Sequence, residues 1–160
     1  MLSMKSLLVM FSYHHNNTEK IAKVLAKVLD AQIKTPQQII PEDLQEYNLI
    51  DFGSGIYDQK HHKNLLDLVD ELPQVTNRKA FIFSTSGVTR KFAMDRAIDD
   101  PHLILREKLE SKGYVIVDEY NCAGHNTNSF LKLFGGLNKG RPNIEDLKYA
   151  EEFAQNLQKK

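Results

Sequence analysis

A short apolar run, a polar loop and an amphipathic helix pattern follow one another without interruption near the start of the chain. The run Leu7–Phe11 has no helical periodicity and is bounded by polar residues, which predicts a strand buried on both faces. From Ile21 to Leu29 the apolar residues recur at helical spacing with lysines on the opposite side, which predicts an amphipathic helix. A buried strand that leads directly into a helix indicates a sheet covered by helices.

The loop between that strand and that helix predicts an anion site. Residues 12–18 hold hydroxyl, imidazole and amide side chains that can donate hydrogen bonds. The first N–H groups of a helix have no partner inside the helix, and the helix dipole places partial positive charge at the same end. We therefore expect a phosphate group to bind at this loop.

The rest of the chain alternates further strand patterns with further helix patterns. This alternation predicts an α/β fold with a parallel sheet and helices on both faces. The predicted strands cover 31–34, 48–53, 80–83 and 114–117, and the last of them has room to continue to Cys122. The predicted helices cover 63–72, 103–112 and 144–157, and a long Gly- and Asn-rich loop covers 124–143.

Three of the predicted strands end in segments that are rich in Ser, Thr, Gly or Asn, namely 12–18, 53–57 and 84–87. Ligands of open parallel sheets bind outside the carboxyl ends of the strands, at the point where the strand order switches direction. We therefore expect the three segments to converge on one site. Gly53 and Gly55, one residue apart, allow the backbone to approach a ligand closely.

Length and composition favour a single globular domain, 1–160, because 160 residues with 41% hydrophobic and 26% charged content can bury a core. The 21 basic and 21 acidic residues cancel, so the net charge favours neither nucleic acid nor an anionic membrane as a partner. Cys122 is the only cysteine, which excludes an intrachain disulfide, suits a reducing cytoplasm and predicts a buried small apolar side chain. The first apolar run is too short for a signal peptide or a membrane span, so we expect a cytoplasmic protein.

Four segments of the chain resemble the flavodoxin family, and together they cover nearly its whole length. The loop 12–18 is similar to the family's phosphate loop, whose usual form is Thr/Ser-x-Thr-Gly-Asn-Thr. Gly53–Asp58 stands where the family has the loop that packs against one face of a flavin, and Ser84–Gly87 stands where the family holds the pyrimidine edge of that flavin. The segment ending in Gly140–Pro142 is similar to a feature of a flavodoxin-like subgroup.

The resemblance implies a flavodoxin-like three-layer sandwich, a five-stranded parallel sheet in the order 2-1-3-4-5, and one non-covalently bound FMN. Asn17 and Thr18 match the end of the phosphate motif, whereas Asn16 stands at its glycine. The chain has no Trp, so Tyr57 is the candidate for contact with the flavin ring. The implied cofactor-binding residues are Ser12, His14, His15, Asn16, Asn17 and Thr18 for the phosphate, Ser54, Gly55, Ile56 and Tyr57 for one side of the ring, and Ser84, Thr85, Ser86 and Gly87 for its polar edge.

The resemblance leaves the function open between two main alternatives, in both of which the flavin carries the chemistry. The first is an electron carrier between a reductase and a protein partner. The second is an FMN-dependent enzyme that reduces a quinone or nitro compound or oxidises a porphyrinogen. A carrier needs an exposed flavin edge, whereas an enzyme needs a pocket over the ring. A third alternative is an FMN-free structural or regulatory relative. No catalytic residue and no oligomeric state is predicted.

Other ligands and activities fit the motifs less well. The adjacent His14 and His15 have no neighbouring carboxylate or cysteine ligand, so no metal site is predicted. His61 and His62 lie near a predicted helix start and are expected to face solvent or to lie at the cofactor rim. The triplet 53–55 is too tight for a nucleophile elbow. Neither a P-loop nor a Gly-x-Gly-x-x-Gly motif follows the first strand.

Overall fold

The computed structural model describes residues 5–11, 17–57, 60–86, 100–123 and 142–159, with the backbone alone for Asn17, Tyr57 and Ala123. These ranges contain strands, α-helices and two short 3-10 helices, Pro36–Gln38 and Pro41–Glu46. The strands are β1 Ser6–Phe11, β2 Gln32–Lys34, β3 Leu49–Tyr57, β4 Lys60–His61, β5 Arg78–Ser86 and β6 Tyr114–Ala123. The α-helices are α1 Asn17–Leu29, α2 Lys63–Glu71, α4 Leu103–Ser111 and α5 Ile144–Leu157.

The main sheet has the order β2-β1-β3-β5-β6, and every pair of neighbours along it is parallel. The predicted five-stranded order 2-1-3-4-5 is therefore confirmed. Strand β4 was not predicted; it pairs antiparallel with the end of β3, Ile56 with His61 and Tyr57 with Lys60. A strand of two residues is too short to produce a recognisable alternation in the sequence.

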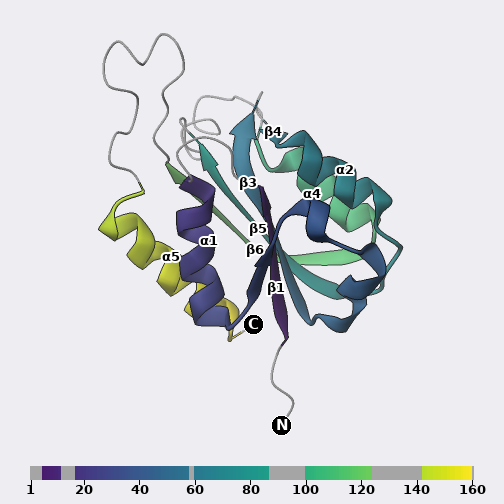
Figure 1. Cartoon of the computed structure of the whole chain (residues 1–160), viewed down its shortest axis with the longest axis horizontal. Helices are drawn as coiled ribbons and strands as arrows, with labels where there is room; N and C mark the ends of the chain where they lie inside the picture. The colour runs from purple at the N-terminus through teal and green to yellow at the C-terminus, as the bar shows by residue number, and fades with distance from the viewer. Residues whose placement is uncertain (1–4, 12–16, 58–59, 87–99, 124–141, 160) are drawn as a thin grey trace.

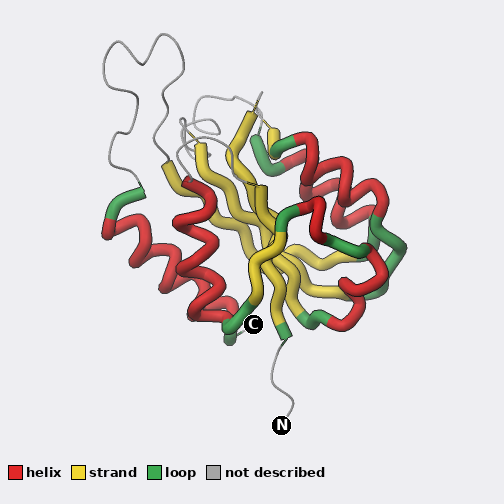
Figure 2. The backbone as a smooth tube through the Cα atoms, in the orientation of Figure 1, coloured by secondary structure: helices red, strands yellow, loops and turns green. Residues whose placement is uncertain are grey.

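Helices cover both faces of the sheet, as the three-layer prediction requires (Figures 1 and 2). On the α1/α5 face, residues such as Leu8 and Phe81 pack in one hydrophobic core. On the α2/α4 face, residues such as Val9, Phe52 and Ile82 pack in another. Successive side chains of a strand point to opposite faces. Each polar side chain near a strand end therefore points either toward α1 and α5 or toward α2 and α4.

Strands β3 and β5 run further than the sequence predicted. Residues 54–57 and 84–86, which were expected to lie in loops, continue their strands. Gly53 pairs with Met10 on one side and with Phe83 on the other, so neighbouring strands satisfy its backbone groups. A Cβ atom on Gly53 would lie 2.0 Å from Phe83 Cε1. This glycine is therefore required for packing inside the sheet.

The longer helices agree with the prediction. The expected ranges 63–72, 103–112 and 144–157 match α2, α4 and α5 to within one residue. Gly113 follows α4 with a φ of 99°, which confirms it as the glycine that ends this helix. Most of the predicted loop, 124–141, lies outside the described residues. Within the described ranges, no helix combines the length and the apolar character that crossing a membrane requires.

Candidate functional site

The carboxyl ends of four strands lie side by side and carry the polar residues of the candidate site. In the sheet register Phe11 lies beside Ser54, Ser54 beside Ser84, and Ser84 beside Asn121. Residues paired in this way point to the same face, here the face of α2 and α4. Thr85 follows Ser84 in the chain and points to the α1/α5 face. The structure thus brings the polar ends of β3 and β5 together.

Part of the predicted site cannot be placed, because Ser12, His14, His15, Asn16 and Gly87 lie outside the described residues. Asn17 begins α1 and Tyr57 ends β3, with only the backbone described. The binding roles assigned to all these residues stay predictions.

A buried hydrogen bond joins the first turn of α1 to the end of β5. The Oγ1 atoms of Thr18 and Thr85 are 2.9 Å apart, and both side chains are buried. Helix α1 is 13 residues long, and its first N–H groups have no partner inside the helix. The threonine pair therefore holds the end of α1 that favours anions beside the end of a central strand.

On the α2/α4 face, Ser54 joins the end of β3 to the start of α2. Its Oγ accepts a hydrogen bond from the backbone N–H of His62 at 3.0 Å and donates to the carbonyl of Gly55 at 2.6 Å. The Nδ1 of His62 caps α2 by accepting from the N–H of Asn64 at 3.0 Å. Its ring stacks on Phe11 with centroids 3.8 Å apart. Burial lowers the pKa of His62, and the cap needs its neutral form.

Of the two places expected for His61, solvent or the cofactor rim, the first is wrong, because the side chain is only 1% exposed. Its Nε2 lies 3.0 Å from the carbonyl oxygen of Phe83 and therefore carries the hydrogen. No described residue accepts from or donates to its Nδ1. Burial and the neighbouring His102 lower the pKa of His61 to about 3, against the opposing effect of the Phe83 carbonyl. The neutral ring of His61 thus binds the β3–β4 hairpin to β5. His61 points inward because it lies in this hairpin, which was not predicted.

Ser84, His102 and Glu119 form a chain of hydrogen bonds that joins β5, α4 and β6. Ser84 Oγ lies 2.6 Å from His102 Nε2, and His102 Nδ1 lies 2.9 Å from Glu119 Oε1. The order resembles that of a hydrolase triad, but Ser84 and His102 are fully buried, so Ser84 is not accessible to a substrate. Asn121 Nδ2 donates to Ser84 Oγ at 2.9 Å and to Ser86 Oγ at 3.1 Å. This series of hydrogen bonds therefore extends to Ser86, the last residue of β5.

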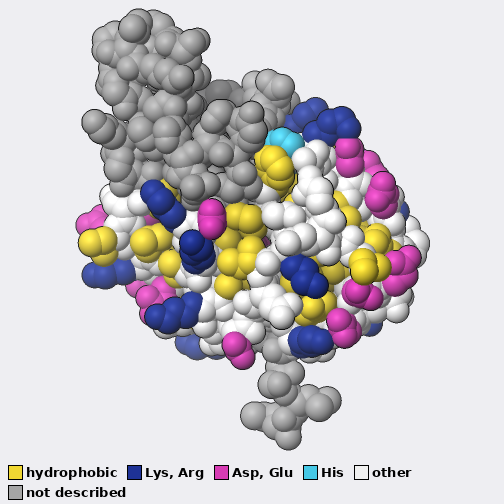
Figure 3. Space-filling model, in the orientation of Figure 1, with side chains coloured by type: hydrophobic (Ala, Val, Ile, Leu, Met, Phe, Trp, Pro, Cys, Tyr) yellow, Lys and Arg dark blue, Asp and Glu magenta, His cyan; other side chains and the backbone are white. Residues whose placement is uncertain are grey.

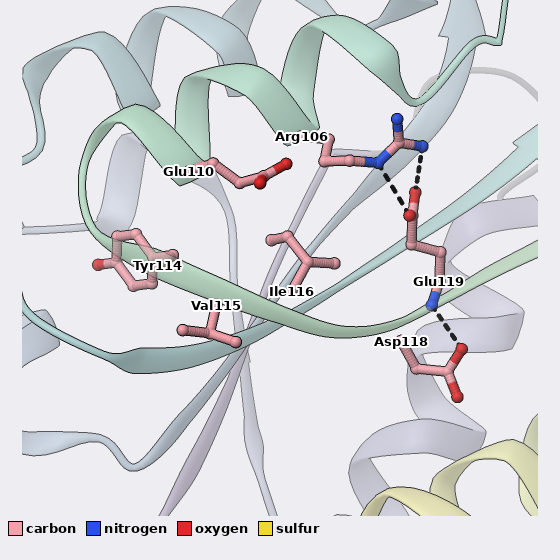
Figure 4. A pocket seen from close by; sticks show the side chains of 7 residues that line it. All are labelled: Arg106, Glu110, Tyr114, Val115, Ile116, Asp118 and Glu119. Carbon is pink, nitrogen blue, oxygen red and sulfur yellow. Dashed lines mark hydrogen bonds and ion pairs between the residues drawn. The ribbon is translucent and has the colours of Figure 1, made fainter.

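Arg106 holds the outer end of this chain. Its Nε and Nη2 each donate to an oxygen of Glu119 at 2.9 Å, and Nη2 also donates to Asp100 at 2.6 Å. Burial by itself raises the pKa of Glu119, but the hydrogen bonds from His102 and Arg106 and the charge of Arg106 outweigh it and lower the pKa to about 2. Glu119 and Arg106 border a hollow of about 510 Å³ between α4 and β6 (Figure 4).

Three polar residues of this network, His102, Glu119 and Asn121, were not predicted from the sequence. Glu119 and Asn121 are two residues apart in β6, so both point to one face. Such a pair is a usable signal, because polar side chains on a covered face need hydrogen-bond partners. His102 begins a helix after Pro101 and has no comparable pattern around it.

The donors at this edge fit an anionic nucleotide cofactor. Thr18 and Thr85 contribute hydroxyl groups on the α1/α5 face and Ser86 contributes one at the end of β5, whereas the buried Ser54 hydroxyl already donates to the carbonyl of Gly55. The start of α1 adds backbone N–H groups. In the part of the chain that the structure describes, no group of three His, Cys, Asp or Glu side chains could hold a metal ion. The strand order defines a protein of the doubly wound α/β class, whose ligands bind at the switch point, here between β1 and β3.

The chain belongs to the flavodoxin family, because the family model described as a flavodoxin domain matches residues 8–136. The cofactor that this membership implies is FMN.

Comparison with known proteins agrees with this assignment. The uncharacterized protein MJ0298 of Methanocaldococcus jannaschii is 47% identical over 156 residues, covering 98% of this chain and 99% of that protein. The solved structure of oxidised flavodoxin 2 from Bacillus cereus has a TM-score of 0.68 at 20% identity and covers 97% of this chain and 98% of its own. A flavodoxin from the domain Archaea has a TM-score of 0.65 at 16% identity, covering 98% and 97%. The two solved structures support the fold.

Proposed function

We propose that the protein binds one FMN at the carboxyl edge of its sheet and carries electrons between a reductase and a protein partner. The observation that supports this most is the convergence of the start of α1 with the polar ends of β3 and β5 in a chain of the flavodoxin family. The proposed phosphate residues are Ser12, His14, His15, Asn16, Asn17 and Thr18. The proposed ring residues are Ser54, Gly55, Ile56 and Tyr57 along one side of the ring, and Ser84, Thr85, Ser86 and Gly87, through their backbone groups, at its polar edge.

FMN, when bound, supplies the electron-transfer chemistry, and the chain binds and orients it. The Thr18–Thr85 pair holds the start of α1 against β5, so the distance between the phosphate end and the ring end of the site is fixed by one buried contact. Ser54 is held by the start of α2, which fixes the end of β3 in the same way. Both contacts join the site to the sheet, and rigid elements position ligands more accurately than loops do.

The surface charge favours a partner that is recognised without a large field of one sign. Acidic and basic side chains are interspersed over the face in Figure 3, in line with 21 of each in the chain. Electrostatic steering is therefore expected to contribute little to the rate of association. Association rates with a redox partner should accordingly change little with salt concentration.

The test of FMN binding uses the purified full chain. We expect flavin absorbance bands after incubation with FMN and removal of the excess, and one FMN per chain in a fluorescence titration. Thr18→Val removes a hydroxyl at the site and should weaken binding about tenfold, equivalent to about 1.4 kcal/mol. Thr35→Val makes the same change at the start of a 3-10 helix on another part of the chain, and should bind FMN as the wild type does. Absence of FMN uptake by the wild-type protein would contradict the proposal.

A redox titration of the FMN-loaded protein separates the carrier from the enzyme. Two resolved one-electron steps, without steady turnover when NAD(P)H is mixed with a quinone, a nitro compound or a porphyrinogen, are expected of the carrier. A single two-electron step with steady turnover of one of these substrates would instead establish the FMN-dependent enzyme.

A further inference from the structure

A chain of four hydrogen-bonded side chains connects the hollow beside α4 with the end of β5; these residues, Glu119, His102, Ser84 and Asn121, are called the relay below. Glu119 borders the hollow at its outer end. His102 and Ser84 are fully buried in the middle. Asn121 reaches Ser86 at the inner end, in the strand proposed to hold the polar edge of the flavin. The function proposed above uses the ends of these strands but gives the relay no role.

The relay has two hydrogen-bonding states. With His102 neutral, Nδ1–H donates to Glu119 and the Ser84 hydroxyl donates to Nε2. With His102 protonated, Nε2–H donates to Ser84 Oγ instead. Asn121 also donates to that oxygen, so the Ser84 proton must then turn toward another acceptor. One proton on His102 therefore reverses the direction of the Ser84 hydroxyl at the strand end.

Several charged or titratable groups face His102 among the described residues. Glu119 lies on its Nδ1, and Asp100 accepts its backbone N–H at 3.0 Å, and both carboxylates favour the imidazolium. Arg106 pairs with both of these carboxylates and weakens their effect. His61 has its ring centroid 5.1 Å away and favours a neutral neighbour. These groups have opposing effects on His102, so the charge of a nearby ligand can decide whether the imidazole is neutral or protonated.

We propose, on the basis of the FMN site proposed above, that His102 is a positioning residue that couples FMN binding to the uptake of one proton. The proton comes from solvent, which reaches the relay at the hollow beside Glu119. Its uptake forms one N–H bond, reverses the Ser84 hydroxyl and places positive charge beneath the strand end where the anionic cofactor binds. FMN and the proton therefore each favour the binding of the other.

His61 is the matched control that the structure offers. It is buried next to His102, on the same face of the sheet, but its ring donates to a backbone carbonyl, and no carboxylate is bonded to it in the described ranges. Its low pKa keeps it neutral across the pH range in which proteins function. Replacing it removes a buried imidazole without removing the relay.

The experiment measures the dissociation constant of FMN by fluorescence at several pH values. One unit of pKa shift in a linked group corresponds to a tenfold change in binding, so FMN should tighten on acidification about tenfold more in the wild type than in His102→Gln. His61→Gln should keep the wild-type pH dependence. The ionisation of the FMN phosphate contributes equally to every variant and cancels in the comparison.

A second measurement needs no substitution and therefore does not depend on a variant that folds. The ring nitrogens of 15N-labelled histidines are followed by NMR in the wild-type protein at one pH, before and after addition of FMN. We expect the signals of His102 to move to the imidazolium positions and those of His61 to remain neutral.

Equal pH dependence in the wild type and His102→Gln, or unchanged His102 signals in the FMN-bound protein, would overturn this inference and leave the FMN site intact. Failure of the wild-type protein to bind FMN at any pH would instead remove the proposed function, and the inference with it.

Discussion

Two acidic residues on opposite faces of the sheet, one fully buried and one partly buried, lie in different environments. Asp51 lies in the middle of β3 on the α1/α5 face, is 0% exposed, and neither of its carboxyl oxygens has a hydrogen-bond partner in the described ranges. Glu119 lies in β6 on the α2/α4 face, where His102 and Arg106 bond both of its oxygens. The same functional group is thus isolated on one face and fully paired on the other.

The protonation of the two groups follows from this difference. Burial raises the pKa of Asp51 well above its ordinary value, against a smaller lowering by the backbone of Phe52. Burial also raises the pKa of Glu119, but its partners lower it to about 2. An uncompensated carboxylate in a core is neutralised, whereas a paired one keeps its charge. The two faces of the sheet therefore shift the pKa of a carboxyl group in opposite directions.

The largest effect is expected from Asp51→Val. In the unfolded state Asp51 loses its proton above pH 3.8, whereas in the folded state it keeps the proton to a higher pH because its pKa is raised. The free energy of unfolding of the wild type therefore falls as the pH rises from 3.8 toward the folded-state pKa. Valine fills the site without a polar group and should raise the free energy of unfolding by about 3 kcal/mol at neutral pH. Urea unfolding from acidic to neutral pH measures this. A valine variant that is no more stable than the wild type at neutral pH would show that Asp51 has a partner in the folded protein.

Glu119→Gln should have nearly as large an effect with the opposite sign. The folded-state pKa of Glu119 is about 2 against an ordinary value of 4.5, so its contribution is complete above pH 4.5 and is lost as the pH falls toward 2. This shift corresponds to about 3 kcal/mol. Glu110→Gln neutralises an exposed carboxylate of α4 beside the same hollow; it is the control, and should unfold like the wild type. If both variants unfold alike over this range, the pairing of Glu119 contributes no stability.

A smaller change in the free energy of unfolding is expected from His61→Gln, and it should be seen below about pH 6.5. His61 is neutral in the folded protein with a pKa of about 3, whereas the unfolded chain takes up a proton near pH 6.5. The wild type should therefore lose about 1.4 kcal/mol per pH unit below that value, and His61→Gln should not. Urea unfolding between neutral pH and about pH 5 separates the two slopes. Parallel slopes would mean that His61 is protonated in the folded state.

The smallest effect is expected at the threonine pair on the α1/α5 face. Thr18→Val or Thr85→Val alone should cost about 1 kcal/mol, because the remaining hydroxyl stays buried without its partner. The double variant should cost less than the sum of the two. Since neither group titrates, the loss should be the same at every pH. A coupling energy near zero in the double-mutant cycle would remove the threonine pair as the contact that fixes α1 against β5.

Much of the fold followed from patterns that are local in the sequence. The run Leu7–Phe11 and the helical spacing of α1 and α5 each report burial of one segment, and the strand–helix alternation limits the order of the sheet. The end of β3 was harder to predict, because Gly53 and Gly55 suggest a turn. The pairing of that segment with β1 and β5 keeps it extended, and such pairing depends on distant residues.

The candidate site divides in the same way. The ends of β3 and β5 were predicted from their Ser, Thr and Gly content, and the structure places Ser54, Ser84 and Thr85 there. His102 and Glu119 were not predicted, because they are 17 residues apart and meet only when α4 packs on β6. Three-dimensional contacts between single residues leave no periodic trace in a sequence.

The most direct test of the site at the carboxyl edge is a titration of FMN into the 15N-labelled protein, followed by amide NMR shifts. We expect the largest shifts at the start of α1 and at the carboxyl ends of β3 and β5, including the amides of Thr18, Ser54 and Thr85. The amides at the opposite edge, such as Arg78 and Tyr114, should move little. Shifts concentrated at Arg78 and Tyr114, or no shifts at saturating FMN, would contradict the placement of the cofactor site.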